Sequence, residues 1–262
     1  MSLLVALAMA QSAQAQPPAA PPFDRAQHVA SLDGAMAKAD YNAIMELALQ
    51  PKSAPEAMAS LDWLGDRFKS GSSIAIAFTY SRLLAGLAAQ LPEGQRDQLR
   101  GTALAAAIYA AAASAIEDRQ CADRTARGTR IQQLSAQIAS SGLLELDDPT
   151  RRLAAAIALD IERKTWEKRK TANEAAFLCM NGMSAMSAGI SAGSVKEEAS
   201  KPGQIGRQMS VKVPDDFVYE RRPDSEWWPE AEKLREQLPQ LVVSLARVDR
   251  LPTEAELATI GK

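Results

Sequence analysis

An alanine-rich run in the middle of the chain places the strongest limit on the fold. Residues 102–116 read TALAAAIYAAAASAI, and they lie between Arg100 and Glu117. Such a run is apolar on almost every side of a helix, so other elements have to enclose it. It is also shorter than the roughly 20 apolar residues that a membrane-spanning helix needs. We therefore predict a buried central helix that begins at Pro92 and ends near residue 118, with closely packed helices around it.

Helix start and stop signals recur along the rest of the chain. Asp40 starts a helix to residue 49, and Ser53 with Glu56 forms a capping box for a helix that Gly71 ends. The same reasoning predicts further helices, which span residues 73–90 after a cap at Ser72 or Ser73, residues 123–141 before a stop at Gly142, and residues 148–188 after Asp148–Pro149.

The longest of these predicted helices shows one apolar stripe. Leu153, Ile157 and Ile161 recur at helical spacing and predict its buried face. Residues 162–174, ERKTWEKRKTANE, are polar almost throughout. We expect them to be solvated on most sides.

The pattern changes after residue 191. Glycine, proline and charged residues interrupt every helical period in residues 192–228, which predicts an extended arm with one short strand at residues 209–213. Residues 229–262 are predicted to hold a final helix to residue 247, with a possible kink at Pro239, and a tail. Trp227 and Trp228 are expected to dock the start of this helix. With an all-helical domain at residues 24–191, the fold class is all-α, either a helical bundle or a short α-solenoid.

The first fifteen residues have the pattern of an export signal. Residues 3–10 are an unbroken apolar run, and Ala13 and Ala15 give the small-x-small pattern of a cleavage site. Cleavage would leave Gln16 at the start of the mature chain, followed by a proline-rich leader at residues 16–23. These features predict a soluble periplasmic or secreted protein.

The two cysteines fit that compartment. Cys121 and Cys179 are the only cysteines of the chain. An even number of cysteines in an oxidising compartment most simply forms a disulfide. We predict that the pair ties the end of the central helix to the end of the long one.

Charge and missing motifs exclude several classes of function. The net charge is −2, from 30 basic and 32 acidic residues, whereas nucleic-acid binding and binding to anionic membranes need a basic face. No phosphate loop, dinucleotide fingerprint or nucleophile elbow occurs in the sequence. His28, the sole histidine, is expected at the surface. We therefore predict no catalytic residues, no cofactor, and a protein or peptide partner in the cell envelope.

Adjacent carboxylates leave a third-ranked enzymatic alternative. Residues 147–148, 197–198 and 215–216 are acidic pairs of the kind that sugar-cleaving enzymes use as acid and base. Neighbouring acids are more often helix caps or solvated turns, and we expect that here.

One helical hairpin, at about residues 57–88, has a recognisable spacing of small and aromatic residues. The residues that carry it are Leu61, Leu64, Gly65, Phe68, Gly71, Ala77 and Tyr80. The spacing resembles a single tetratricopeptide or Sel1-like hairpin, in which a small residue lets two helices approach and an aromatic fills the gap. The resemblance implies a curved array whose concave face holds an extended peptide or a partner helix. An ordinary hairpin within a globular bundle is the alternative.

Four aromatic residues of this hairpin are candidates for an interaction surface. They are Trp63, Phe68, Phe78 and Tyr80. Their spacing favours a position in the core for most of them.

A methionine recurs every three residues after Cys179. Met180, Met183 and Met186 are predicted to be pliable core residues. Thioethers also bind Cu(I), so a copper site is the alternative. Ala185, Gly189 and Gly193 predict a close contact with another helix.

Together these features predict an exported helical protein that acts as a protein-interaction or adaptor module of the envelope. The alternative is a periplasmic protein that binds a small molecule or Cu(I) through residues 179–186.

Overall fold

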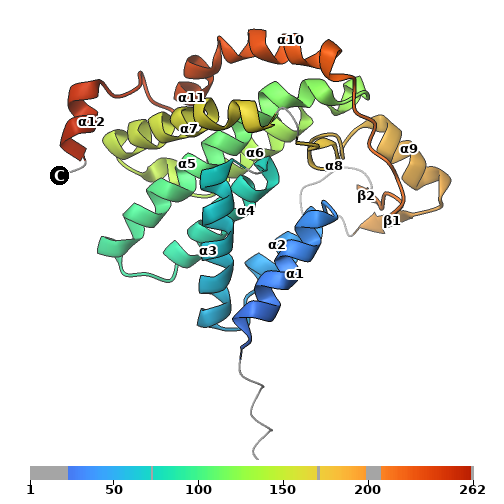
Figure 1. Ribbon diagram of the computed structural model, residues 1–262, viewed down its shortest axis with the longest axis horizontal. Helices are drawn as coiled ribbons and strands as arrows, with labels where there is room; N and C mark the ends of the chain where they lie inside the picture. Colours follow the sequence, from blue (N-terminus) through green and yellow to red (C-terminus); the bar gives the residue numbers. More distant parts are fainter. Residues whose placement is uncertain (1–22, 72, 170–171, 199–207, 261–262) are drawn as a thin grey trace, which may run out of the picture.

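The computed structural model describes residues 23–71, 73–169, 172–198 and 208–260, and this part of the chain is all-α (Figure 1). The predicted export signal and almost all of the leader lie outside it. The helices are α1 Arg25–Ala37, α2 Tyr41–Leu49, α3 Ala54–Ser70, α4 Ile74–Ala88, α5 Glu93–Glu117, α6 Thr129–Ser140, α7 Asp148–Arg169, α8 Ala175–Leu178, α9 Met183–Ser191, α10 Asp224–Arg235, α11 Leu238–Ala246 and α12 Glu254–Ile260. Strands β1 Val195–Glu198 and β2 Gln208–Val211 form an antiparallel pair.

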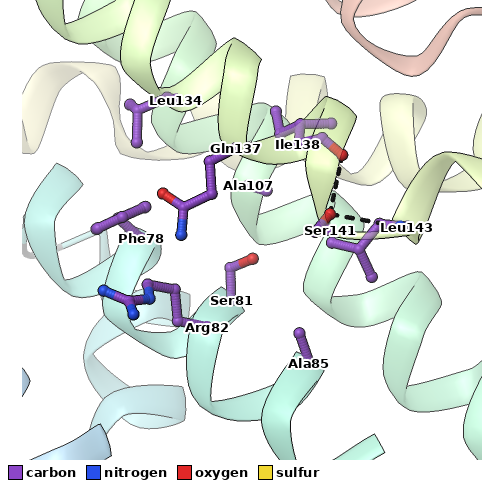
Figure 2. Close-up of a pocket in the computed structure, with 10 residues that line it drawn as sticks. All are labelled: Phe78, Ser81, Arg82, Ala85, Ala107, Leu134, Gln137, Ile138, Ser141 and Leu143. Atoms are coloured by element: carbon purple, nitrogen blue, oxygen red, sulfur yellow. Dashed lines mark hydrogen bonds between the residues drawn. The ribbon is translucent and has the colours of Figure 1, made fainter. Parts of the chain in front are cut away.

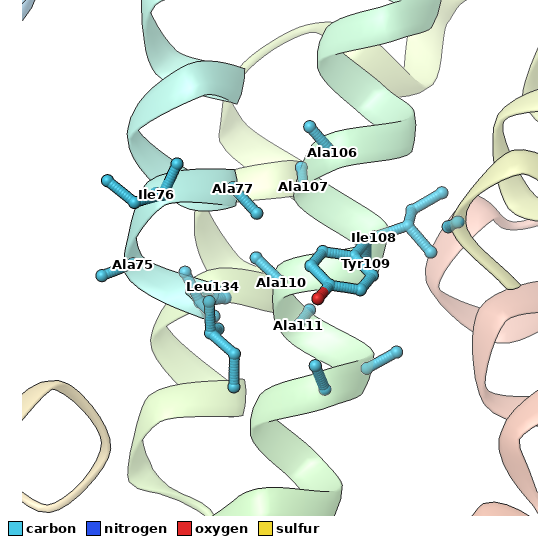
Figure 3. Close-up of a cluster of buried hydrophobic side chains, with 14 of the residues drawn as sticks. Ala75, Ile76, Ala77, Ala106, Ala107, Ile108, Tyr109, Ala110, Ala111 and Leu134 are labelled. Carbon is cyan, nitrogen blue, oxygen red and sulfur yellow. The ribbon is translucent and has the colours of Figure 1, made fainter. Parts of the chain in front are cut away.

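Helix α5 is the centre of the bundle, as the alanine run predicts. It packs against α4, α6, α7 and α11, and every side chain from Ala103 to Ala113 is buried. Figure 3 shows Ala77 of α4 and Leu134 of α6 beside the methyl groups of α5. Methyl side chains let neighbouring backbones approach closely, which explains how several helices can pack around α5. By length and composition Gly94–Gln120 could cross a membrane, and 72% of its most apolar window is buried inside the protein.

Helices α2 and α3 begin and end at the predicted residues. Asp40 accepts a hydrogen bond from the Ala43 N–H (3.0 Å) at the start of α2, and Ser53 accepts one from the Glu56 N–H (3.3 Å) at the start of α3. Gly71 ends α3 with a φ of 67°. A Cβ at that position would lie 2.2 Å from the Thr165 side chain, so both the backbone and the packing require glycine there.

Helices α3 and α4 form the predicted hairpin. The position of a Cβ on Gly65 lies 3.4 Å from the Tyr80 hydroxyl, and the rings of Tyr80 and Phe68 are 5.4 Å apart. The small residue therefore does face the aromatic one. Any tight helical pair uses such a contact, so the resemblance to a repeat hairpin stays a prediction.

Two predicted helices are shorter in the structure. Helix α6 begins at Thr129 rather than at residue 123, because Asp123 caps a separate turn, Arg124–Ala126, by accepting from the Thr125 N–H (2.9 Å). Helix α7 ends at Arg169 rather than at residue 188, and α8 and α9 follow as separate helices.

The buried face of α7 also differs from the predicted stripe. Ile157 is 39% exposed, and Leu153 and Ile161 are only partly buried. The buried face instead carries small and charged residues: Ala154, Ala155, Ala158, Leu159, Glu162, Thr165, Trp166 and Arg169. The predicted solvated stretch is therefore largely buried on one side. Small side chains on α7 pack well against α5, whose facing residues are mostly alanine.

The C-terminal part contains three helices where one was predicted. Helix α10 starts at Asp224 and includes Pro229, and α11 starts at Leu238 with Pro239 in its first turn. The proline therefore begins a new helix rather than kinking a long one. Trp227 is buried, and Trp228 stacks on Trp166 with ring centroids 4.0 Å apart, so the predicted docking is confirmed.

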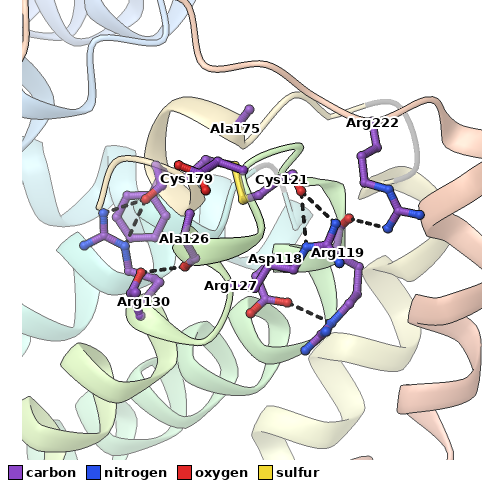
Figure 4. The surroundings of a disulfide bond; sticks show 12 residues. Asp118, Arg119, Cys121, Ala126, Arg127, Arg130, Ala175, Cys179 and Arg222 are labelled. Atoms are coloured by element: carbon purple, nitrogen blue, oxygen red, sulfur yellow. Dashed lines mark hydrogen bonds and ion pairs between the residues drawn. A yellow bond between two sulfur atoms is a disulfide. The ribbon is translucent and has the colours of Figure 1, made fainter. Parts of the chain in front are cut away.

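Between α8 and α10 the chain leaves the bundle and returns to the point that it left. Cys179 is joined to Cys121 by a disulfide, with Cα atoms 5.5 Å apart (Figure 4). The returning chain pairs with the same segment: the Ala122 N–H donates to the Glu220 carbonyl (3.2 Å), and the Arg222 N–H donates to the Gln120 carbonyl (2.7 Å). We call residues 180–219 the excursion. It contains α9, the β1–β2 hairpin and the extended arm that leads to α10.

Candidate functional site

Exposed apolar side chains gather on the excursion. Nine large hydrophobic side chains are exposed in the described part of the chain, and six of them belong to this segment: Met183, Met186, Ile190, Val195, Met209 and Val218. Val218 is 76% exposed. Single exposed apolar residues are ordinary, but such a concentration is typical of an interaction surface.

Contacts at its start fix the orientation of α9. The Met183 N–H donates to the Thr125 hydroxyl and the Ser184 N–H donates to the Asp123 carboxylate, each at 2.8 Å. Burial alone would raise the pKa of Asp123, but hydrogen bonds from Thr125 and Ser184 lower it to about 2. The carboxylate is therefore charged at neutral pH and stabilises the N-terminal end of the helix.

The inner side of α9 carries small residues. Ala185 is 1% exposed, and a Cβ on Gly189 would lie 2.4 Å from Val211 of β2. The predicted close contact of small residues is therefore present, but its partner is a strand rather than a helix. With this face turned inward, Met183, Met186 and Ile190 face outward.

The strand pairing places the hairpin's apolar residues beside α9. Val195 pairs with Val211, and Glu197 pairs with Met209. Alternate residues of a strand share a face, so Val195, Met209 and Val211 lie on one side of the hairpin. Since Val211 contacts Gly189, this side faces α9. The apolar residues of the helix and of the hairpin therefore border one another.

A cavity of about 170 Å³ opens between the start of α9 and the arm. Its lining includes Ala185 and Ser184 from α9 and Phe217, Val218 and Tyr219 from the arm. The rings of Phe217 and Tyr219 are 4.9 Å apart. This volume can hold an apolar side chain of another molecule, at the edge of the exposed surface.

The methionines differ from their prediction. Met180 is partly buried, but Met183 and Met186 are 54% and 42% exposed. The prediction of core packing is therefore wrong for Met183 and Met186, because nothing in the described chain covers the outer face of α9. Cys179 is held in the disulfide and offers no thiolate to a metal. Within the described residues, no group of three or more His, Cys, Asp or Glu side chains could hold a metal ion.

The four aromatic candidates of the α3–α4 hairpin are divided between core and edge. Trp63 and Phe68 are 4% and 5% exposed, and the Trp63 indole N–H donates to Asp33 (3.0 Å). These two residues are therefore core rather than surface. Phe78 and Tyr80 are partly buried.

His28 is buried between α1 and α3 rather than at the surface. Its Nε2 lies 2.8 Å from the Ser60 hydroxyl, and its Nδ1 lies 3.7 Å from a Glu56 oxygen. The order of groups is that of a serine hydrolase triad. Ser60, however, is 0% exposed and lies within α3, so no substrate reaches its hydroxyl and its own N–H is used by the helix. We interpret this contact as packing.

The acidic pair at the start of α7 also has a structural role. Asp147 accepts from the Thr150 N–H (2.9 Å), and Asp148 pairs with Arg151 and Arg152 (3.3 and 2.6 Å). Both carboxylates are therefore engaged in capping and ion pairs. This arrangement fits the helix-cap interpretation.

A buried charge cluster lies between α5 and α7. Arg169 donates to Glu117 (2.5 Å), to Glu162 (3.1 Å) and to the Tyr109 hydroxyl (3.0 Å). Arg235 of α10 reaches Glu162 from the outside at 3.0 Å. Burial raises the pKa of Glu117, and the positive charge of Arg169 offsets part of this rise. The cluster joins three helices.

Glu174 forms a second buried polar contact. Its carboxylate accepts from the Ser73 hydroxyl (3.2 Å) and from the Ile74 N–H at the start of α4. Burial, followed by the charge of Glu117, raises its pKa to about 8. Neither this contact nor the charge cluster contributes to the lining of the α9 cavity. We interpret both as structural contacts that hold the helices of the bundle together.

In comparisons with known proteins, no family model, no curated protein and no solved structure matches this chain.

Proposed function

We propose that the protein is an exported interaction module of the cell envelope, and that the excursion binds an apolar segment of a protein partner. The observation that carries the proposal is the concentration of exposed apolar side chains on α9, the hairpin and the arm. Methionine side chains are flexible and polarisable, so such a surface adapts to a partner's side chains.

Two further features support the proposal. The cavity beside Val218 offers room for an anchoring side chain of the partner, and interfaces depend on a few such anchors. The disulfide supports export, because disulfides persist in oxidising compartments.

A site-specific crosslink tests the partner. Benzoylphenylalanine placed at Met186 should give one crosslinked product of defined mass in the native envelope fraction. The same group at Lys164, which is exposed on α7, serves as the background. Ile190→Asp should abolish the product, whereas Ile157→Asp should retain it. Ile157 is exposed as well, but it lies on α7.

Three results would contradict the proposal. One is a yield at Met186 no higher than at Lys164. Another is a product that survives Ile190→Asp. The third is a product of twice the protein's own mass, which would mean that a second copy occupies the surface.

The exposed thioethers favour one second candidate. Met183 and Met186 are one helical turn apart and accessible, so Cu(I) binding through Met180, Met183 and Met186 is the alternative function. A Cu(I) titration against a competing chelator tests it. We expect no stoichiometric complex. A complex that Met183→Leu weakens would favour the copper alternative.

A further inference from the structure

A second cavity, separate from the excursion, lies between α4, α5 and α6. Its volume is about 140 Å³. The apolar side chains that line it are Phe78, Ala85, Ala107, Leu134, Ile138 and Leu143. At Ala85 of α4 and Ala107 of α5 the lining side chain is only a methyl group, which leaves space opposite the larger side chains of α6. These two small residues contribute to the open volume of the cavity.

The polar groups of this cavity differ in what they offer. The Ser81 hydroxyl donates to the Ala103 carbonyl (2.7 Å), and the Ser141 hydroxyl donates to the Ile138 carbonyl (2.8 Å). Both hydroxyl protons are therefore already used. The remaining donors at the cavity are the Arg82 guanidinium and the Gln137 side-chain amide.

Arg82 supplies a positive charge at the solvent-facing edge of this cavity. No carboxylate within the described residues forms an ion pair with it, and the centroid of the Phe78 ring lies 5.8 Å from its guanidinium carbon. In the view of Figure 2, Phe78, Arg82 and Gln137 lie on one side of the cavity, and Ala85, Ser141 and Leu143 lie on the other. The cavity thus combines an apolar interior with a cationic edge.

We propose that this cavity binds a linear aliphatic monocarboxylate of about six to eight carbons. A cavity of similar size, about 150 Å³, holds benzene, which sets the scale at about six carbons. The chain lies among the apolar side chains, and its carboxylate pairs with Arg82 and accepts from Gln137. Arginine suits this role because its planar fork matches a carboxylate. A cationic or neutral head group would lack that pairing.

Calorimetric titration with butanoate, hexanoate and octanoate tests the proposal on the full mature chain. Each added methylene should raise the affinity about fourfold until the cavity is filled. Octylamine should not bind, and a tripeptide that ends in leucine should not compete with octanoate.

Two variants locate the site. Arg82→Gln should weaken octanoate binding about tenfold, while Arg163→Gln, a change of an exposed arginine on α7, should leave it unchanged. Ala85→Leu fills the cavity and should abolish binding while the cationic edge remains. Arg82 is exposed, so its replacement keeps the fold even if Ala85→Leu does not.

The proposal is overturned if no carboxylate binds at millimolar concentration, or if octylamine binds as well as octanoate. Equal affinity in Arg82→Gln and in the unchanged protein would also overturn it. Binding of the leucine-terminated tripeptide alone would show that the cavity recognises a chain terminus instead of a free acid.

Discussion

The α5–α7 interface and the outer face of α9 depart from the usual distribution of side chains in opposite directions. Between α5 and α7, Glu117, Glu162 and Arg169 are each 1% exposed, whereas Met183 and Ile190 on α9 are more than half exposed. Arg169 pairs with both glutamates, which offsets part of the cost of burying these charges, and the second carboxylate oxygen of Glu117 has no hydrogen-bond partner among the described residues. The exposed apolar groups find no such compensation within the described chain. The bundle therefore buries charges that it largely pairs, whereas the excursion leaves apolar side chains in contact with solvent.

The largest effect should come from the buried charge cluster. Arg169→Met leaves Glu117 and Glu162 buried without their central partner, and it should lower the free energy of unfolding by about 3–5 kcal/mol. Urea denaturation at neutral pH measures this. Arg163→Met on the solvent side of the same helix should change it by less than about 0.5 kcal/mol. Equal effects of the two changes would mean that the interior does not depend on its ion pairs.

The disulfide joins the two regions and should rank second. It links residues 58 positions apart, for which loop entropy gives at most about 4 kcal/mol. Cys121→Ser and Cys179→Ser should destabilise the protein equally. Amide hydrogen exchange should accelerate in the excursion more than in α5 and α7. Uniform acceleration in both regions would contradict the division between them.

The pH dependence of stability tests the buried polar groups of the bundle. Glu174 has its pKa raised from 4.5 to about 8 in the folded protein, so folding favours its protonated form. Its contribution to stability is full below about pH 4.5 and is lost as the pH rises to about 8. Glu174→Gln stays neutral and should show a smaller loss of unfolding free energy between pH 5 and pH 9. Glu236→Gln, a change of an exposed glutamate, should behave like the unchanged protein.

The smallest effect is expected on the outer face of α9. Met183→Gln and Met186→Gln should each change the free energy of unfolding by less than about 0.5 kcal/mol, because both side chains are already exposed. Thermal denaturation checks this. A loss above about 2 kcal/mol would show that these methionines pack within the protein after all.

Local signals predicted the fold well where one residue decides the outcome. Asp40, Ser53 and Gly71 cap the helices that their residue types indicate, and the alanine run is the centre of the bundle. The two cysteines are joined as expected. Each of these features depends on chemistry within a few residues or on the only available pairing.

Predictions failed where a neighbouring helix decides which side chains are buried. Apolar periodicity selected Ile157 for the buried face of α7, but the adjoining helix is lined with methyl groups, which admit Ala158 and the paired Glu162 instead. The signal that could have found this face is the spacing of Glu162, Thr165 and Arg169 along one side of a helix. Methionine spacing likewise cannot show that α9 is covered on one side only.

The segments that flank the excursion on either side meet at Cys121. Cys179 is bonded to Cys121, and Arg221 forms a β-bridge with the same cysteine. A segment that starts and finishes at one place can grow, shrink or change its sequence without rerouting the rest of the chain. The sequence of the excursion can therefore change independently of the helices of the bundle.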